Sequence, residues 1–165
     1  DPMSSKGARL TTHISIPARY LVYMPNSSHI GVSQKLDNEE ERKRLKTLIR
    51  KQLEIFNGGG YIVRTVAEGI SEKALYADMV FLEKIWQSIQ ENNISSNAAK
   101  MVYEDLPLAM RVMRDIADTD IDAIRIDSRE TYDKVSKFAQ KFIPELAQNI
   151  EYYPGERPIF DLYGV

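Results

Sequence analysis

The chain has 165 residues, of which 43% are apolar and 28% charged, and its formal net charge is −2 at pH 7. This length suffices for one medium domain or two small ones with a hydrophobic core, and the small net charge excludes a protein that coats nucleic acid by bulk electrostatics. The absence of cysteine excludes a disulfide framework, a thiolate zinc site and a thiol nucleophile, and no apolar run approaches the roughly 18 residues of a membrane span.

The first elements of the chain are predicted to be strands. Residues 1–5 have the composition of a cloning remnant and are left out of the fold prediction. Residues 9–15 and 19–24 are rich in β-forming residues, and we expect them to pair as a hairpin around the break at Pro17. A third, short strand is expected over residues 30–36.

A long helix is predicted next, over residues 37–56, with apolar side chains at spacings of three and four. Asp37 is its expected N-cap, because Glu40 follows three positions later in a capping-box pattern. A second long helix is expected over residues 72–91, with Ser71 as its N-cap.

Between these helices, Tyr61–Val63 is predicted to be a strand that ends in Arg64 and Thr65. An arginine next to a hydroxyl at the end of a strand can hold a small anion, because the guanidinium binds phosphate oxygens in a bidentate manner. The ordinary alternative is that Arg64 forms a surface ion pair and Thr65 has no special role. The two interpretations differ in whether the donors of Arg64 converge on a cavity or are taken by a carboxylate such as Glu68 or Glu72.

The charge distribution also singles out this part of the chain. Residues 1–70 carry 11 Lys and Arg against 7 Asp and Glu, whereas residues 71–165 carry 11 against 17. The basic excess around Arg64 is a modest indication of an anionic partner on that side.

The second half is predicted to alternate between helix and strand after a polar linker at residues 93–100. One helix is expected to start at Pro107 and to bury Leu108, Val112 and Ile116, and a later helix is expected to have Asp127 as its N-cap. The alternation predicts an α/β-like unit whose two strands, over residues 123–127 and 149–153, pair in parallel. Two strands are too few for a complete sheet. The whole chain is therefore assigned to the α+β class.

Residue chemistry alone predicts no catalytic centre and no metal site. His13 and His29 lack companions at metal-ligand spacing. The acidic residues between Asp115 and Asp127 lack the EF-hand pattern, and we interpret them as a solvated turn followed by an N-cap.

Longer motifs carry more information than any single spacing. The runs K-G-A-R-L-T-T-H-I-S-I-P-A-R-Y-L-V-Y-M-P (Lys6–Pro25), G-Y-I-V-R-T-V-A-E-G (Gly60–Gly69) and E-Y-Y-P-G-E-R-P-I-F-D-L-Y-G-V (Glu151–Val165) strongly resemble the bacterial ribonuclease E/G family. The resemblance covers nearly the whole chain. Details such as A-I-R-I-D-S-R-E-T-Y are closer to the ribonuclease G branch than to the ribonuclease E branch.

The resemblance implies a domain organisation and an activity. Residues 6–92 resemble the family's 5′-sensor domain, residues 93–100 a linker, and residues 101–165 part of an RNase H-like subdomain. In this family an S1-type RNA-binding domain lies upstream, and a DNase I-like catalytic domain that binds magnesium lies downstream. The resemblance therefore implies a cytoplasmic, homo-oligomeric endoribonuclease acting in RNA processing and decay. This part of it is expected to hold no cofactor and to be catalytically inactive alone. Truncation can also lead two copies to exchange elements and form an artefact dimer.

The resemblance also implies a binding site for the 5′-monophosphate of single-stranded RNA. Arg64 and Thr65 match the Arg-Thr pair that grips this phosphate, and Val22 matches an apolar residue of the pocket wall. Ala18 stands where ribonuclease E has glycine, and Lys35 stands in place of one arginine of an Arg-Arg pair that contacts RNA. The competing hypothesis is a non-catalytic scaffold or interaction module without an RNA-end pocket.

Overall fold

The computed structural model describes residues 2–3, 6–8, 10–56, 58–94, 101–116 and 120–164. The fold is mixed α+β, as predicted, and the chain divides into two compact units, Asp1–Leu82 and Glu83–Val165. The second long helix, α2 (Glu72–Ile94), contains the point of division. Residues 95–100 of the predicted linker lie outside the described residues.

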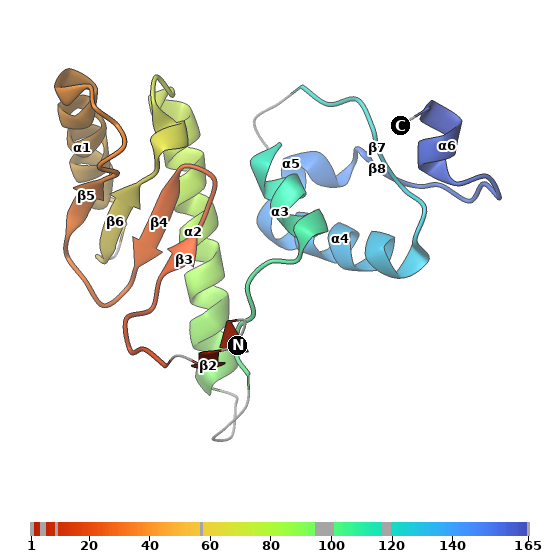
Figure 1. Ribbon diagram of the computed structural model, residues 1–165, viewed down its shortest axis with the longest axis horizontal. Coiled ribbons are helices and arrows are strands. Elements are labelled where there is room, and N and C mark those ends of the chain that lie inside the picture. The colour runs from red at the N-terminus through yellow and green to blue at the C-terminus, as the bar shows by residue number, and fades with distance from the viewer. Residues whose placement is uncertain are drawn as a thin grey trace. The chain divides into compact units, whose positions relative to one another are not determined.

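The first unit is built on a four-stranded sheet in the order β3-β4-β6-β5 (Figure 1). The described elements of this unit are β1 (Pro2–Met3), β2 (Lys6–Ala8), β3 (Ile16–Pro17), β4 (Leu21–Met24), β5 (Ile30–Val32), α1 (Glu39–Leu53), β6 (Gly60–Val63), the 3₁₀ turn η1 (Thr65–Ala67) and the start of α2. β4 runs antiparallel to β3 and β6, whereas β5 runs parallel to β6. Strands β1 and β2 form a separate antiparallel pair.

One face of this sheet is buried and the other is more open. Leu21 and Tyr23 of β4 and Tyr61 and Val63 of β6 are buried together with apolar residues of α1 and α2. Their neighbour Val22 in β4 is only half-buried, and so is Ile62 in β6. This period of two is what a sheet covered by helices on one face requires.

The predicted strand over residues 9–15 is wrong. Residues 10–15 form no strand, and Leu10 and Ile14 are 93% and 45% exposed. The hairpin is instead formed by β3 and β4, which are joined by a tight turn in which the Ala18 N–H donates to the Leu21 carbonyl at 2.8 Å. The segment before β3 has β-forming residues but no neighbouring strand to pair with, and propensity alone does not make a strand.

Two predicted N-caps are displaced by one residue. The cap of α1 is Asn38, whose Oδ1 accepts the N–H groups of Glu40 at 3.0 Å and Glu41 at 3.1 Å, and not Asp37. The cap of α4 (Arg129–Phe142) is Ser128, which accepts the Thr131 N–H at 3.2 Å, and not Asp127. By contrast, the cap of α2 is the predicted Ser71, which accepts the Ala74 N–H at 3.1 Å.

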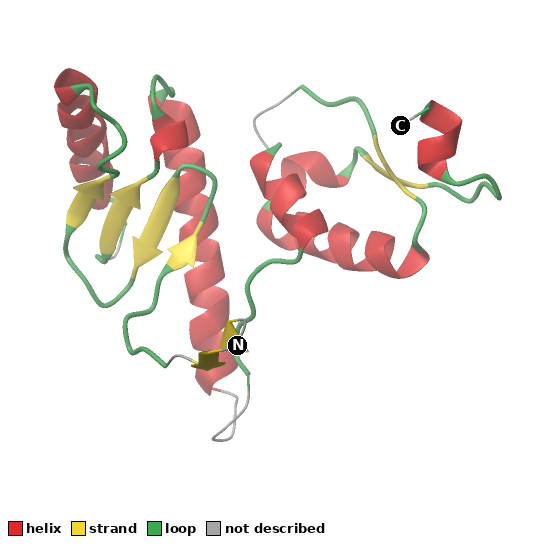
Figure 2. Ribbon diagram, in the orientation of Figure 1, coloured by secondary structure: helices red, strands yellow, loops and turns green. Residues whose placement is uncertain are grey.

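The second unit contains a parallel pair of short strands, which confirms the predicted pairing (Figure 2). Its described elements, besides the end of α2, are α3 (Leu108–Asp115), β7 (Ile124–Ile126), α4 (Arg129–Phe142), α5 (Pro144–Ala147), β8 (Ile150–Tyr152) and α6 (Ile159–Tyr163). No described helix of the chain is long and apolar enough to cross a membrane.

The prediction for the buried face of α3 is wrong for Leu108 and Val112, while the third predicted residue, Ile116, is half-buried. Leu108 and Val112 are 70% and 48% exposed, whereas Met113 and Arg114 are buried. Leu108 and Val112 line an open hollow of about 650 Å³ whose walls also come from β7, α4 and α6. The apolar stripe of this helix therefore faces a hollow and not the packed interior.

Candidate anion-binding site

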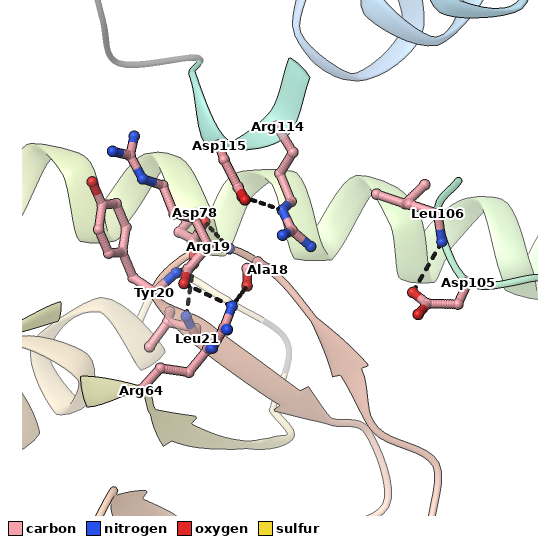
Figure 3. A network of polar contacts seen from close by, with 10 residues as sticks. All are labelled: Ala18, Arg19, Tyr20, Leu21, Arg64, Asp78, Asp105, Leu106, Arg114 and Asp115. Carbon is pink, nitrogen blue, oxygen red and sulfur yellow. Dashed lines mark hydrogen bonds and ion pairs between the residues drawn. The ribbon is translucent and has the colours of Figure 1, made fainter. Parts of the chain in front are cut away.

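Arg64 lies directly after β6 and is tied to the β3–β4 turn. Its backbone N–H donates to the Tyr20 carbonyl at 2.8 Å. Its Nη1 donates to the carbonyls of Ala18 at 2.7 Å and Arg19 at 3.0 Å (Figure 3). Among the described residues, no carboxylate pairs with this guanidinium, and its Nε and Nη2 have no acceptor. The side chain is thus anchored through one nitrogen and keeps the other two available.

The turn that anchors Arg64 is itself held by a buried acid of α2. The Asp78 carboxylate, 7% exposed, accepts the backbone N–H groups of Arg19 at 3.2 Å, Tyr20 at 2.8 Å and Leu21 at 2.9 Å (Figure 3). Charge-assisted hydrogen bonds of this kind are stronger than neutral ones. Asp78 therefore fixes the backbone that presents the Ala18 and Arg19 carbonyls to the guanidinium.

Asp78 was not among the predicted site residues, although its position in the sequence indicates that it is buried. The residue lies between Leu75 and Leu82 on the side of α2 that is otherwise apolar. A carboxylate at a buried position is rare unless it is paired or hydrogen-bonded. An acid within an apolar helical stripe therefore predicts a specific buried partner, but it does not say which one.

Thr65 opens η1 and lies beside Ser33 at the end of β5. Its hydroxyl donates to Ser33 Oγ at 3.2 Å, and Ser33 Oγ also accepts the Lys35 N–H at 3.3 Å. The Thr65 N–H has no acceptor among the residues that the structure describes. Ser33 was not predicted as a site residue, because its position depends on the parallel pairing of β5 with β6.

These residues meet at a surface hollow of about 480 Å³. Its walls are formed by seven residues from the ends of β5 and β6: Ser33, Lys35, Ile62, Val63, Arg64, Thr65 and Val66. Two cations and two hydroxyls line it, and none of the lining residues is acidic. A hollow of this composition favours a small anion.

The neighbouring carboxylates do not neutralise Arg64. Glu72 pairs instead with Lys51 at 2.8 Å and accepts a hydrogen bond from Gln52 at 3.1 Å. In the described part of the chain, Glu68 forms no ion pair. The observation that would have favoured a simple surface ion pair is therefore not found there.

The predicted pocket residues differ in their distance from the hollow. Arg64, Thr65 and Lys35 all line it. Val22 does not, but it is the β-ladder partner of Ile62, which does. Ala18 is fully buried and takes part through its carbonyl oxygen, which holds Arg64.

A second polar link fixes the loop that follows η1. The Glu41 carboxylate of α1 accepts the Arg44 Nε and Nη2 protons, both at 2.6 Å, and the Gly69 N–H at 2.8 Å. Arg44 Nη2 also donates to the Ile70 carbonyl at 3.0 Å. The pKa of Glu41 is lowered to about 2, chiefly by the hydrogen bonds from Arg44 and to a smaller extent by the Gly69 N–H, against the opposing effect of burial. Gly69 has φ +72°, which favours glycine at this turn.

The described members of the other candidates are not arranged as a metal site. Among the described residues, no group of three or more His, Asp or Glu side chains is placed to hold a metal ion. Asp115 pairs with Arg114 at 2.7 Å, and Asp118 lies outside the described residues. His13 and His29 are both exposed.

The candidate site is thus a hollow with cationic and hydroxyl donors at the end of a strand, in a small α+β unit. Comparison with known proteins identifies the family of the chain. The model of the ribonuclease E/G family matches residues 15–165, and the chain belongs to this family, as the sequence motifs indicated.

Relatives from both branches of the family align with the chain. It is 46% identical to ribonuclease G of Salmonella typhimurium (strain SL1344) and 45% identical to ribonuclease G of Escherichia coli (strain K12), each over all 165 residues and 33% of the relative. It is 35% identical over 144 residues to ribonuclease E of Nostoc sp., covering 86% of this chain and 20% of that relative. The chain thus spans about a third of the length of these ribonuclease G relatives.

Proposed function

We propose that this chain binds the 5′-monophosphate end of single-stranded RNA, as part of an endoribonuclease of the ribonuclease G/E type. The observation that carries the proposal is the convergence of Arg64, Thr65 and Lys35 on one hollow that no acidic side chain lines. The names of its ribonuclease relatives support RNA as the polymer.

The donors suit a terminal phosphate because they converge on one place, and a terminal phosphate carries its negative charge on a few neighbouring oxygens. With Nη1 held by two carbonyls, the Nε and Nη2 edge of Arg64 offers two parallel N–H groups for bidentate binding. On binding, the Thr65 hydroxyl would turn from Ser33 Oγ to the phosphate and, with the Thr65 N–H, would add two donors, while Lys35 adds a point charge. The anchored guanidinium loses little conformational entropy on binding, which favours affinity. A 5′-hydroxyl end would leave these donors unmatched.

In the whole protein, anchoring the 5′ end would raise the local concentration of RNA at a catalytic site elsewhere in the protein. Ribonuclease activity of this kind would use magnesium-assisted phosphodiester hydrolysis by carboxylates. The described residues contain no cluster of acids or histidines suited to a metal. We therefore expect this chain alone to bind RNA ends without cutting them, and we expect the whole protein to act in cytoplasmic RNA processing and decay as a homo-oligomer.

The test is a calorimetric titration of the chain with a short single-stranded RNA that carries a 5′-monophosphate, beside the same RNA with a 5′-hydroxyl. One phosphate and one nucleotide provide few contacts, so we expect a Kd on the order of 0.1 mM for the phosphorylated RNA. Arg64→Ala should remove most of this binding. Arg64→Lys should not restore it, because a lysine cannot form the two parallel hydrogen bonds.

Arg111→Ala is the matched control, because Arg111 is an exposed arginine of α3 that does not line the hollow. It removes the same charge and should leave the binding unchanged. Equal binding of the two RNAs, or equal loss of binding in the two variants, would mean non-specific electrostatics and would refute the proposal. The interaction-module alternative would then be the better account.

A further inference from the structure

Beside the anion-binding hollow, the open face of the sheet carries a row of residues that crosses three strands. Ile62 of β6 is the ladder partner of Val22 in β4 on one side and of Gly31 in β5 on the other. Ile62 also lines the hollow. Because alternate residues of a strand share a face, Ile62 and Arg64 both belong to this open side of the sheet.

The glycine in this row makes room for an imidazole ring. A Cβ atom on Gly31 would lie 3.1 Å from Nε2 and 3.4 Å from Cδ2 of His29, and 3.6 Å from Cγ1 of Ile62. The His29 ring therefore occupies the space above Gly31 in which a side chain would otherwise stand, next to Ile62. Any larger residue at position 31 would have to displace the ring.

The backbone of His29 is held in place, while its ring stays exposed. Its carbonyl accepts the Tyr61 N–H at 2.9 Å, which joins it to β6, and its N–H donates to Ser27 Oγ at 3.1 Å. The side chain is exposed to solvent. An aromatic ring on a fixed backbone, lying against an apolar strand face, is a surface on which a nucleobase can stack.

We propose that His29 stacks on the base of the first nucleotide when the 5′-phosphate of that nucleotide occupies the Arg64–Thr65 hollow. The inference rests on the proposed function and adds a residue that contacts the base. Two residues along a strand span about 6.6 Å, which is on the order of the distance between a 5′-phosphate and its own base. Val22 and Ile62 would then contact the edge of the same nucleotide, and recognition would extend from the phosphate to the base without selecting its sequence.

The test compares two 5′-monophosphorylated RNA probes that differ only in whether the first nucleotide carries a base or is abasic. His29→Ala should weaken binding of the base-bearing probe by roughly tenfold, the size of one base–aromatic stack, and should leave binding of the abasic probe unchanged. His29→Phe should keep the affinity for the base-bearing probe, because it keeps the aromatic face. Gly31→Ala should weaken that affinity slightly, because its Cβ would lie 3.1 Å from His29 Nε2 and push the ring outward by a few tenths of an ångström. His13→Ala, at the other exposed histidine, is the control.

The outcomes separate this inference from the proposed function. If wild-type chain does not distinguish 5′-phosphate from 5′-hydroxyl RNA, the proposed function fails and the inference fails with it. If the phosphate preference holds but His29→Ala binds both probes as the wild type does, only the inference fails. If His29→Ala weakens both probes equally, or His29→Phe binds as weakly as His29→Ala, His29 contacts the phosphate and the stacking proposal is refuted.

Discussion

At the scale of single residues, Arg64 illustrates how a charge can be held in place without being neutralised. An arginine that is positioned by a carboxylate loses much of its attraction for an anion. Arg64 is instead held by the Ala18 and Arg19 carbonyls, which are neutral. The negative charge that organises this region, Asp78, acts one step away through backbone N–H groups.

This arrangement predicts a large effect of a substitution that does not touch the hollow. Asp78→Ala leaves three backbone N–H groups without their acceptor, and we expect the free energy of unfolding to fall by about 3 kcal/mol. Urea unfolding followed by circular dichroism measures this change. Asp37→Ala is the matched control, because Asp37 is exposed and caps no helix, and it should be nearly neutral. A similar small effect for both substitutions would contradict the role given to Asp78.

The residue scale also shows what the sequence alone could predict. Arg64 and Thr65 could be singled out because they are adjacent and follow a recognisable strand. The partners of Arg64 could not, because Ala18 and Arg19 lie far from it in the sequence and meet it only through the fold. From the sequence, His29 could be weighed only for a metal or general-base role, since its position above Gly31 and beside Ile62 depends on the pairing of β5 with β6.

At the scale of elements, the long helices were located well and their first residues less well, and the short helix α5 was not predicted. In α1 the prediction chose Asp37 over Asn38, and in α4 it chose Asp127 over Ser128. Both members of each pair are good caps, so local chemistry could not decide between them. Which of the two residues is the cap depends on the residue at which the helix begins, and the fold as a whole decides that.

The cap assignment for α1 can be tested by two adjacent substitutions. Asn38→Ala removes the acceptor of the Glu40 and Glu41 N–H groups, and it should lower the free energy of unfolding by about 1 kcal/mol. Asp37→Ala should change it by less than about 0.5 kcal/mol. Thermal unfolding of both variants measures the difference. A larger loss for Asp37→Ala than for Asn38→Ala would show that the prediction from the capping box was right after all.

Strands and buried faces were harder to predict than helices, for one physical reason. A strand needs a partner, and residues 10–15 have β-forming side chains but no partner strand. The apolar stripe of α3 predicts a buried face, but Leu108 and Val112 line an open hollow. In both cases the local pattern is real, and its outcome depends on what the rest of the fold places next to it.

At the scale of the whole molecule, the division into two units falls inside α2, between Leu82 and Glu83. The prediction from the sequence places a domain boundary in the polar, aperiodic stretch at residues 93–100, of which residues 95–100 lie outside the described residues. A continuous helix gives no such signal, because its periodicity is unchanged where its packing partners change. Within the first unit, polar contacts between elements contribute to the stability of the chain.

One such contact, from α1 to the loop after η1, predicts that stability depends on pH. The pKa of Glu41 is about 2 in the folded chain against 4.5 for an unperturbed glutamate. Because folding lowers this pKa, the ionised carboxylate stabilises the folded state fully above pH 4.5, and this contribution is lost as the pH falls from 4.5 towards 2. Allowing for solvent screening, we expect it to be roughly 1 to 2 kcal/mol.

The variant Glu41→Gln isolates this contribution from the other acids that titrate in the same range. Urea unfolding of wild type and variant at pH 7, 5, 4 and 3 gives the difference in unfolding free energy at each pH. The difference should be constant at pH 7 and 5, smaller at pH 4 and smaller again at pH 3, since protonation of Glu41 makes the wild type resemble the variant. A difference that does not change with pH would contradict this prediction. It would mean that the negative charge of Glu41, which faces Arg44 and the Gly69 N–H, contributes nothing to the free energy of unfolding.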